Sequence, residues 1–160
     1  MAQKPNPECM RLAIREAGKN VRRGSCGGPF GACIVKEGRV LTVARNAVLK
    51  NDASAHAEIN AIRAACRKLK TFDLSGCTIY STTEPCPMCF AAIHWARIRS
   101  VIYGTSISDV KKRGFNELDI SCAEMKARGK SRVRIVAHFL KSECLRLLRD
   151  WDALPAKRVY

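Results

Sequence analysis

Short apolar runs alternate with helical periods along this 160-residue chain, and that order restricts its fold more than any other feature. A first helix is predicted to open at Asn6-Pro7, because asparagine caps helices well and proline suits the first turn. Two apolar runs around Glu37-Gly38 predict a β-hairpin. The later elements are predicted to alternate, with helices opening near 52–54, 87 and 142 and strands at 77–81, 100–103 and 134–139. This order predicts a three-layer α/β/α sandwich in which helices cover both faces of a mixed five-stranded sheet.

The length of the chain fits one domain, predicted to span residues 1–160, because two smaller pieces could hardly bury separate cores. No run of 18 or more apolar residues occurs, which excludes a transmembrane helix. The first five residues hold no apolar segment of a secretory signal, so we expect a cytoplasmic protein. The nine cysteines are odd in number and are expected to be free or metal-bound rather than paired in disulfides.

Charge is the unusual part of the composition. The chain has 29 Lys and Arg against 14 Asp and Glu, a formal net charge of +15. Such an excess attracts polyanions, nucleic acids included. The two densest basic stretches, 111–113 and 126–134, contain no interleaved aromatic residues, which weakens the case for a surface that stacks single-stranded bases. The composition therefore permits nucleic-acid binding without favouring it over a small-molecule substrate.

Three side chains of metal-ligand type lie at predicted helix starts: His56, Cys86 and Cys89. The two cysteines are the one pair with ligand spacing, and the unpaired N–H groups of a helix start favour the thiolate. Zinc binds imidazole and thiolate, and three protein ligands leave the fourth position for water. The pattern predicts one zinc ion per chain, at a site where water ionises near neutral pH.

Glu58, two residues after His56, supplies the group that a hydrolytic zinc site needs. Its carboxylate can take a proton from water and return it to a ring nitrogen and to departing ammonia. Residues two apart in a regular helix point about 200° from each other. We therefore expect His56 to lie in a frayed first turn. The order His-x-Glu and Pro-Cys-x-x-Cys matches the signature of zinc deaminases.

A basic zinc module that binds nucleic acid without catalysis is the alternative outside the enzymes. It requires a fourth protein ligand to close the metal site. Cys66, Cys77, Cys122 and His94 are the residues available for that role, and none has the spacing of a partner. The motifs favour the open, hydrolytic site.

With these motifs, the chain resembles the cytidine deaminase-like superfamily over nearly its whole length. Two branches compete, the bacterial guanine deaminases and the tRNA adenosine deaminases that edit the wobble base. Four segments are similar to the guanine deaminase versions: GGPFGA at 27–32, NDASAHAE at 51–58, AIHWAR at 92–97 and GFNE at 114–117. In place of GGPFGA, the tRNA enzymes tend to carry a valine-proline-valine version. The family versions of the last two are AIYWAR and GFDD.

The resemblance also implies a substrate site. It implies that Asn46 hydrogen-bonds the base, that Phe30 and Trp95 shape the pocket, and that Glu117 reads the purine. In guanine deaminases the C-terminal segment is exchanged between two subunits. The resemblance therefore implies a homodimer in which Tyr160 closes the pocket of the partner.

The predicted reaction is the conversion of guanine and water to xanthine and ammonia. Guanine carries adjacent donors, its N1–H and its amino group, which suit a buried carboxylate, whereas N1 of adenine is an acceptor and would repel it. Asn116 stands where the family has an acid, so guanosine or another aminated heterocycle stays open as the substrate. Deamination of adenosine to inosine in tRNA is the alternative that the positive charge supports.

Overall fold

The computed structural model describes residues 4–22 and 26–160, so Met1 to Gln3 of the segment examined for a secretory signal lie outside it. The strands form a five-stranded mixed sheet in the order β2-β1-β3-β4-β5, which confirms the predicted architecture. The pairs β1–β2 and β1–β3 are antiparallel, whereas β3–β4 and β4–β5 are parallel. The strands are β1 Gly31–Lys36, β2 Arg39–Arg45, β3 Cys77–Thr83, β4 Ser100–Thr105 and β5 Arg134–Val136.

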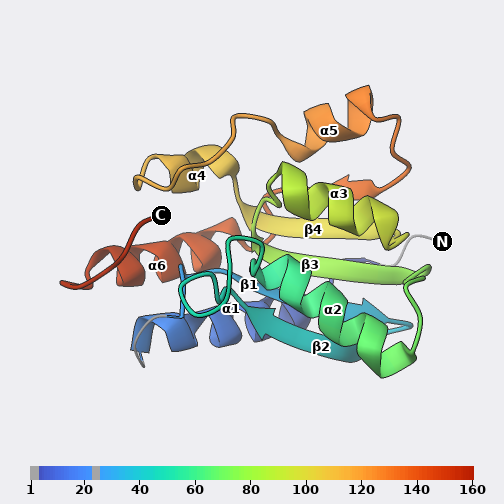
Figure 1. Ribbon diagram of the computed structural model, residues 1–160, viewed down its shortest axis with the longest axis horizontal. Helices are drawn as coiled ribbons and strands as arrows, with labels where there is room; N and C mark the ends of the chain where they lie inside the picture. The colour runs from blue at the N-terminus through green and yellow to red at the C-terminus, as the bar shows by residue number, and fades with distance from the viewer. Residues whose placement is uncertain (1–3, 23–25) are drawn as a thin grey trace.

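Helices cover both faces of this sheet (Figure 1). On one face, α2 packs on β1 and β2 and also contacts α3, which in turn contacts α5. On the other face, α1 crosses β1, β2 and β3, and α6 packs on β4 and α1. The helices are α1 Pro7–Arg22, α2 Ala57–Leu69, α3 Pro87–Trp95, α4 Ile107–Lys111, α5 Cys122–Arg128 and α6 Lys141–Asp152. No helix in the described ranges is long and apolar enough to cross a bilayer.

Alternation along the strands gives each face of the sheet its own core. Ala32 and Ile34 of β1 face α2 and α3, where they join Phe90 in the larger cluster. Cys33 and Val35 face the opposite way, toward α1 and α6. Because both faces are covered, the central strands are buried along nearly their whole length rather than alternating between buried and exposed residues.

Three predicted boundaries differ from the structure. The predicted caps Asp52 and Ser54 bond each other in a turn, and α2 begins only after His56, which occupies the N-cap. Strand β4 continues through Gly104, because a residue without Cβ lets Cys144 of α6 approach closely. Strand β5 is shorter than predicted and ends at Val136.

The segment from 106 to 130, which the sequence left ambiguous, contains the two short helices α4 and α5. Each begins with a serine capping box, in which Ser106 pairs with Asp109 and Ser121 pairs with Glu124. Between them runs the 112–121 loop (residues 112–121), which carries four residues that line the main pocket. The helices thus set the two ends of a loop that reaches the functional site.

Candidate zinc and purine site

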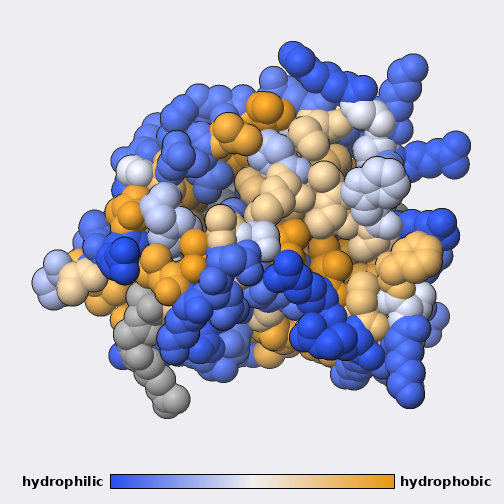
Figure 2. Space-filling view, in the orientation of Figure 1, coloured by the Kyte–Doolittle hydropathy of each residue, from blue (hydrophilic) through white to orange (hydrophobic). Residues whose placement is uncertain are grey.

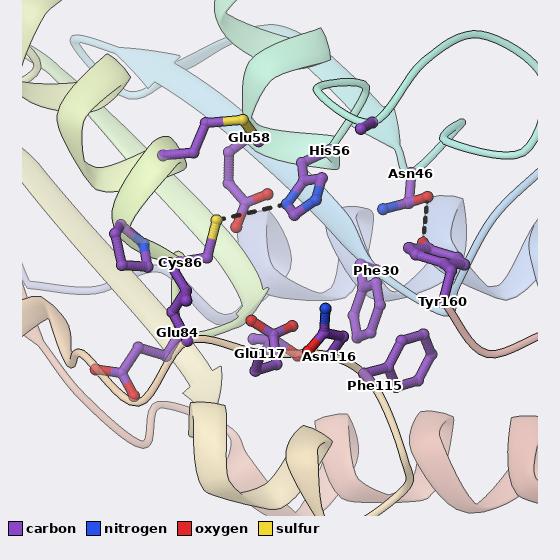
Figure 3. Close-up of a pocket in the computed structure, with 15 residues that line it drawn as sticks. Phe30, Asn46, His56, Glu58, Glu84, Cys86, Phe115, Asn116, Glu117 and Tyr160 are labelled. Carbon is purple, nitrogen blue, oxygen red and sulfur yellow. Dashed lines mark hydrogen bonds between the residues drawn. The ribbon is translucent and has the colours of Figure 1, made fainter.

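A cavity of about 280 Å³ lies where α2, α3 and the 112–121 loop meet (Figure 3). The N-terminal ends of α2 and α3 open into it, so residues at both helix starts reach one space. Aromatic, polar and acidic side chains line the cavity: Phe30, Asn46, His56, Glu58, Thr83, Glu84, Cys86, Met88, Phe115, Asn116, Glu117 and Tyr160 among them. Seven of the nine predicted site residues thus share one pocket, and Cys89 lies beside it.

His56, Cys86 and Cys89 form one group whose ligand atoms lie within 4.8 Å of one another. Nδ1 of His56 is 3.7 Å from Sγ of Cys86 and 3.5 Å from Sγ of Cys89. Tetrahedral zinc with ordinary bond lengths separates a sulfur ligand from a nitrogen ligand by about 3.6 Å. The three side chains therefore fit zinc without rearrangement.

The predicted open coordination agrees with the rest of the described chain. In residues 4–22 and 26–160, no fourth His, Cys, Asp or Glu joins this group. The side chain of Cys122 donates to the carbonyl of Pro85 instead, and His94 pairs with the hydroxyl of Ser131. A closed site, which the non-enzymatic alternative requires, is not formed by these residues.

The helix start at His56 explains how His56 and Glu58 serve one site. As N-cap of α2, His56 has extended backbone angles, φ −65° and ψ 155°, while Glu58 is already helical. His56 thus lies just before the first turn, rather than within a frayed first turn as expected. Both side chains therefore point to the end of the helix, where Glu58 accepts from Ser81 Oγ at 3.0 Å and from Cys89 Sγ at 3.6 Å.

The electrostatics of the cluster favour a bound cation. Hydrogen bonds from Cys89 and His56 lower the pKa of the Cys86 thiol to about 4. Burial lowers the pKa of His56, but the bond to Cys86 and the charge of Glu58 outweigh it and raise the value to about 8. Burial raises the pKa of Glu58. A half-buried thiolate attracts a positive ion, which is the role that zinc fills.

Asn46 and Tyr160 meet on the opposite side of the pocket (Figure 3). Oδ1 of Asn46 accepts from the Tyr160 hydroxyl at 2.7 Å and from the Val48 amide at 3.1 Å. The amide nitrogen of Asn46 faces away from Tyr160, so it is the donor left for a ligand. The Tyr160 hydroxyl also accepts from the backbone amide of Gly28 at 2.9 Å. Tyr160 thus lies where the sequence predicted, but in the pocket of its own chain.

Aromatic rings form the wall that carries Tyr160. Phe115 lies 5.1 Å from Phe30 and 5.5 Å from Tyr160, both in edge-on contact, and 5.0 Å from Trp151. Phe30 therefore shapes the pocket as predicted. Phe115 was missed as a site residue, although it precedes the predicted Asn116-Glu117 pair directly.

Glu117 faces the pocket from the 112–121 loop, across from His56 and Glu58 (Figure 3). Burial, followed by the charge of Cys86, raises its pKa to about 7. Glu117 is only half-buried, and its pKa lies near neutrality. Such a carboxyl suits the recognition of adjacent N–H donors on a ligand. The structure brings Glu117 into the site that the resemblance implied for it.

The prediction that Trp95 shapes the pocket is wrong for the single chain. Trp95 is the last residue of α3 and is 76% exposed. Only the first turn of α3 reaches the cavity, and eight residues of helix carry Trp95 about 12 Å farther along the axis. Figure 2 shows apolar side chains gathered on the face that includes α3. Met88 and Trp95 of α3 are exposed, as is Phe72, whose ring lies 5.3 Å from Arg97 just beyond the helix.

Asn20 is a supporting residue that sequence reasoning missed. It is buried, and its Nδ2 donates to the carbonyls of Gly28 and Asn46 at 2.8 and 2.9 Å. It thereby joins the segment that binds Tyr160 to the residue expected to bind the base. A signal was present, because Asn20 continues the buried stripe of Met10, Ala13 and Ala17 on α1.

Comparison with known proteins identifies the family. Residues 3–105 match the model of the cytidine and deoxycytidylate deaminase zinc-binding region. A guanine deaminase of Bacillus subtilis is 43% identical over 109 residues, 68% of this chain and 69% of that protein. A tRNA-specific adenosine deaminase of Buchnera aphidicola is 33% identical over 143 residues, 89% of this chain and 90% of that protein.

A solved structure in complex with 2,6-diaminopurine is also similar, at 28% identity and a TM-score of 0.82, over 99% of this chain and 87% of that one. The fold, the zinc-binding group and the residues matched by the family model all indicate the same family. The chain belongs to the cytidine and deoxycytidylate deaminase family of zinc-dependent aminohydrolases, with His56, Cys86 and Cys89 as its zinc-binding group.

Proposed function

We propose that this protein is a purine deaminase that converts guanine and water to xanthine and ammonia. The observation that carries the proposal is the carboxyl of Glu117, which faces the pocket across from the zinc-binding group. It offers acceptors to the N1–H and amino group of guanine, and it would oppose N1 of adenine. The relatives include both a guanine deaminase and a tRNA adenosine deaminase, so family membership does not decide between the two activities and the proposal rests on this pocket residue.

The chain's own residues divide the work of the reaction. Zinc at His56, Cys86 and Cys89 supplies the Lewis acidity that brings the pKa of water near neutrality. Glu58 takes one proton from the attacking water and delivers it to a ring nitrogen of the purine, and it then carries the second proton of that water to the leaving amine. Burial raises the pKa of Glu58 above that of a free carboxyl, which suits a group that must both accept and release a proton.

The remaining pocket residues hold the base and exclude water. The amide nitrogen of Asn46 donates to a ring acceptor, while Phe30 and Phe115 pack against the purine. Tyr160 closes the pocket from the C-terminal end. Burial in this wall raises the pKa of Tyr160 to about 12, so its hydroxyl keeps the proton that bonds Asn46.

A homodimer of a single domain spanning residues 1–160 is part of the proposal. Three exposed apolar side chains on and beside α3 support it, because a second copy would cover them: Met88, Trp95 and Phe72. Within the dimer, the C-terminal segment closes its own pocket, as here, or exchanges and closes that of the partner. Sedimentation gives the mass, and loss of the dimer in Trp95→Glu identifies the face. A monomeric parent protein contradicts this part.

The second candidate is deamination of adenosine in tRNA. The net charge of +15 and the relative matched over 89% of this chain favour it. The pocket opposes it through Glu117, which meets an acceptor rather than a donor at N1 of adenine.

Ammonia release from the zinc-loaded protein over a panel of guanine, guanosine, 2,6-diaminopurine, adenine and tRNA tests the proposal. We expect guanine to show the highest kcat/KM. We also expect that rate to change little with salt, whereas an enzyme with six or more phosphate contacts loses about 10³-fold or more in affinity between about 50 and 200 mM salt. Ammonia release confined to tRNA, with that steep salt dependence, would contradict the proposal.

A further inference from the structure

Glu84 lines the cavity, but its buried carboxylate turns away from the zinc-binding group. It is 7% exposed, and Figure 3 shows its carboxylate turned away from His56 and Glu58. Oε2 of Glu84 accepts from the backbone amide of Ile107 at 3.1 Å. Oε1 accepts from the backbone amide of Cys122 at 2.9 Å. One carboxylate therefore bonds two amides that are fifteen positions apart in the sequence.

These two amides are the first N–H groups of α4 and α5, which the helices cannot satisfy themselves. The serine caps do not serve them, because Ser106 and Ser121 accept from Asp109 and Glu124, two positions farther on. Glu84 is thus the partner of both. Its removal leaves two buried donors without an acceptor, a costly change for a buried amide.

The chain between these two helix starts includes the 112–121 loop, whose Phe115, Asn116 and Glu117 line the pocket. Glu84 itself is fixed at the end of β3, where its backbone amide donates to the carbonyl of Thr105 at 2.7 Å. The side chain of Cys122 further donates to the carbonyl of Pro85 at 3.3 Å. Both ends of the loop are therefore tied to the turn that leads directly into Cys86.

We propose that Glu84 is a positioning residue that ties the 112–121 loop to the metal-binding turn and so determines which purine the pocket accepts. Because Glu117 stands on this loop, its distance from the zinc-binding group depends on the two bonds of Glu84. The part of the inference that concerns purine choice rests on the proposed function; the tie itself does not.

Glu84→Gln is the test, with Glu124→Gln as its matched control. In Glu84→Gln, the new NH₂ group faces one of the two backbone N–H donors and cannot accept from it. Glu124 is a suitable control because it is an exposed carboxylate in the capping box at the start of α5. In Glu84→Gln we expect the amides of Ile107 and Cys122 to exchange hydrogen about tenfold faster or more. We expect kcat/KM for guanine to fall about tenfold, mainly through KM, and the preference over the other purines to narrow, with zinc still at one per chain.

Two results would overturn the proposal. One is a KM, purine preference and amide exchange in Glu84→Gln that match those of Glu124→Gln. The other is loss of zinc from Glu84→Gln, which would assign Glu84 to the Cys86 turn rather than to the loop.

A second pair of variants serves if Glu84→Gln does not fold. Ile107→Pro removes one of the two N–H groups that bond to Glu84. Ile107 is the first residue of α4, a position that tolerates proline, and Ser106 before it already has the extended backbone that proline requires of its preceding residue. Ile107→Ala controls for the lost side chain. Weaker purine preference in the proline variant than in the alanine variant supports the tie, and equal preference overturns it.

The two proposals fail separately. If the zinc-loaded parent protein releases ammonia from none of the purines, the proposed function is wrong. Amide exchange at Ile107 and Cys122 then decides the tie alone: faster exchange in Glu84→Gln supports it, and unchanged exchange overturns it.

Discussion

Three glutamates of this site differ in environment rather than in chemistry. Glu58 is buried beside the thiols and bonded to Ser81, in the position of a proton carrier. Glu117 is half-buried and faces the pocket from the 112–121 loop. Glu84 is buried with both oxygens bonded to backbone amides. At the residue scale, the surroundings of each carboxylate indicate its role.

The role of Glu117 predicts a pH profile. Only its ionised form accepts from both donors of guanine. Its pKa is raised to about 7, so that form is present above this pH and is lost as the pH falls through it. Bound zinc, being positive, moves the transition to lower pH. We expect kcat/KM for guanine to decline on the acid side of about pH 7 or somewhat below, in a profile measured by ammonia release.

Glu117→Gln checks that assignment. The amide keeps one acceptor but opposes the second donor of guanine, so we expect kcat/KM to fall about 10²-fold and the acid decline to change, because only the contribution of Glu58 remains. Glu124→Gln, outside the pocket, is the control. The same acid decline and the same purine preference in Glu117→Gln would remove Glu117 from the site.

The zinc ligands and Glu58 were predictable from sequence because their spacing is a local property of two helix starts. The burial of Asn20 could be predicted from the helical period of α1, but its bonds and those of Glu84 could not, because they join segments distant in the chain. Trp95 lies outside the pocket of the single chain, and a motif similarity carries no information on how far along α3 that pocket extends.

At the scale of elements, the hairpin and the long helices followed from local patterns, whereas α4 and α5 did not. These helices have five and seven residues, too short for a clear apolar period. Their starts depend on serine caps and on Glu84, which belongs to another strand end. The least predictable segment of the fold is therefore the one whose ends are fixed by tertiary contacts.

Helix α6 supports the pocket through Trp151, which is fully buried against Phe115. We expect Trp151→Ala to lower the free energy of unfolding by about 3–5 kcal/mol in denaturant titration, because it leaves a large cavity. Trp151→Phe is the control. It removes an indole N–H that has no hydrogen-bond partner, so we expect a distinctly smaller loss. Equal losses in both variants would contradict this account of the packing.

At the scale of the whole molecule, the zinc-binding group joins the starts of two helices that are thirty residues apart in the sequence. His56 precedes α2 and Cys86 precedes α3, so bound zinc stabilises the folded chain against the unfolded one. With free zinc about 1,000-fold above its Kd, this linkage is worth about 4 kcal/mol.

Chelation of the zinc should therefore lower Tm by about 10 °C in a thermal melt. Cys86→Ala should lose zinc and melt near the temperature of the chelated parent protein. Cys66→Ala is the control. Cys66 lies in α2, ten residues beyond His56 and outside the zinc-binding group, so this variant should keep the metal. A Cys86→Ala protein that holds one zinc per chain would contradict the ligand set.

The account as a whole depends on a zinc-binding group that works together with Glu58 as the proton carrier. The most direct test measures zinc content and ammonia release from guanine on the same preparations of the parent protein and Glu58→Gln. We predict one zinc per chain in both proteins and a loss of turnover of about 10³-fold or more in the variant. Unchanged turnover in a zinc-loaded Glu58→Gln protein would contradict the account.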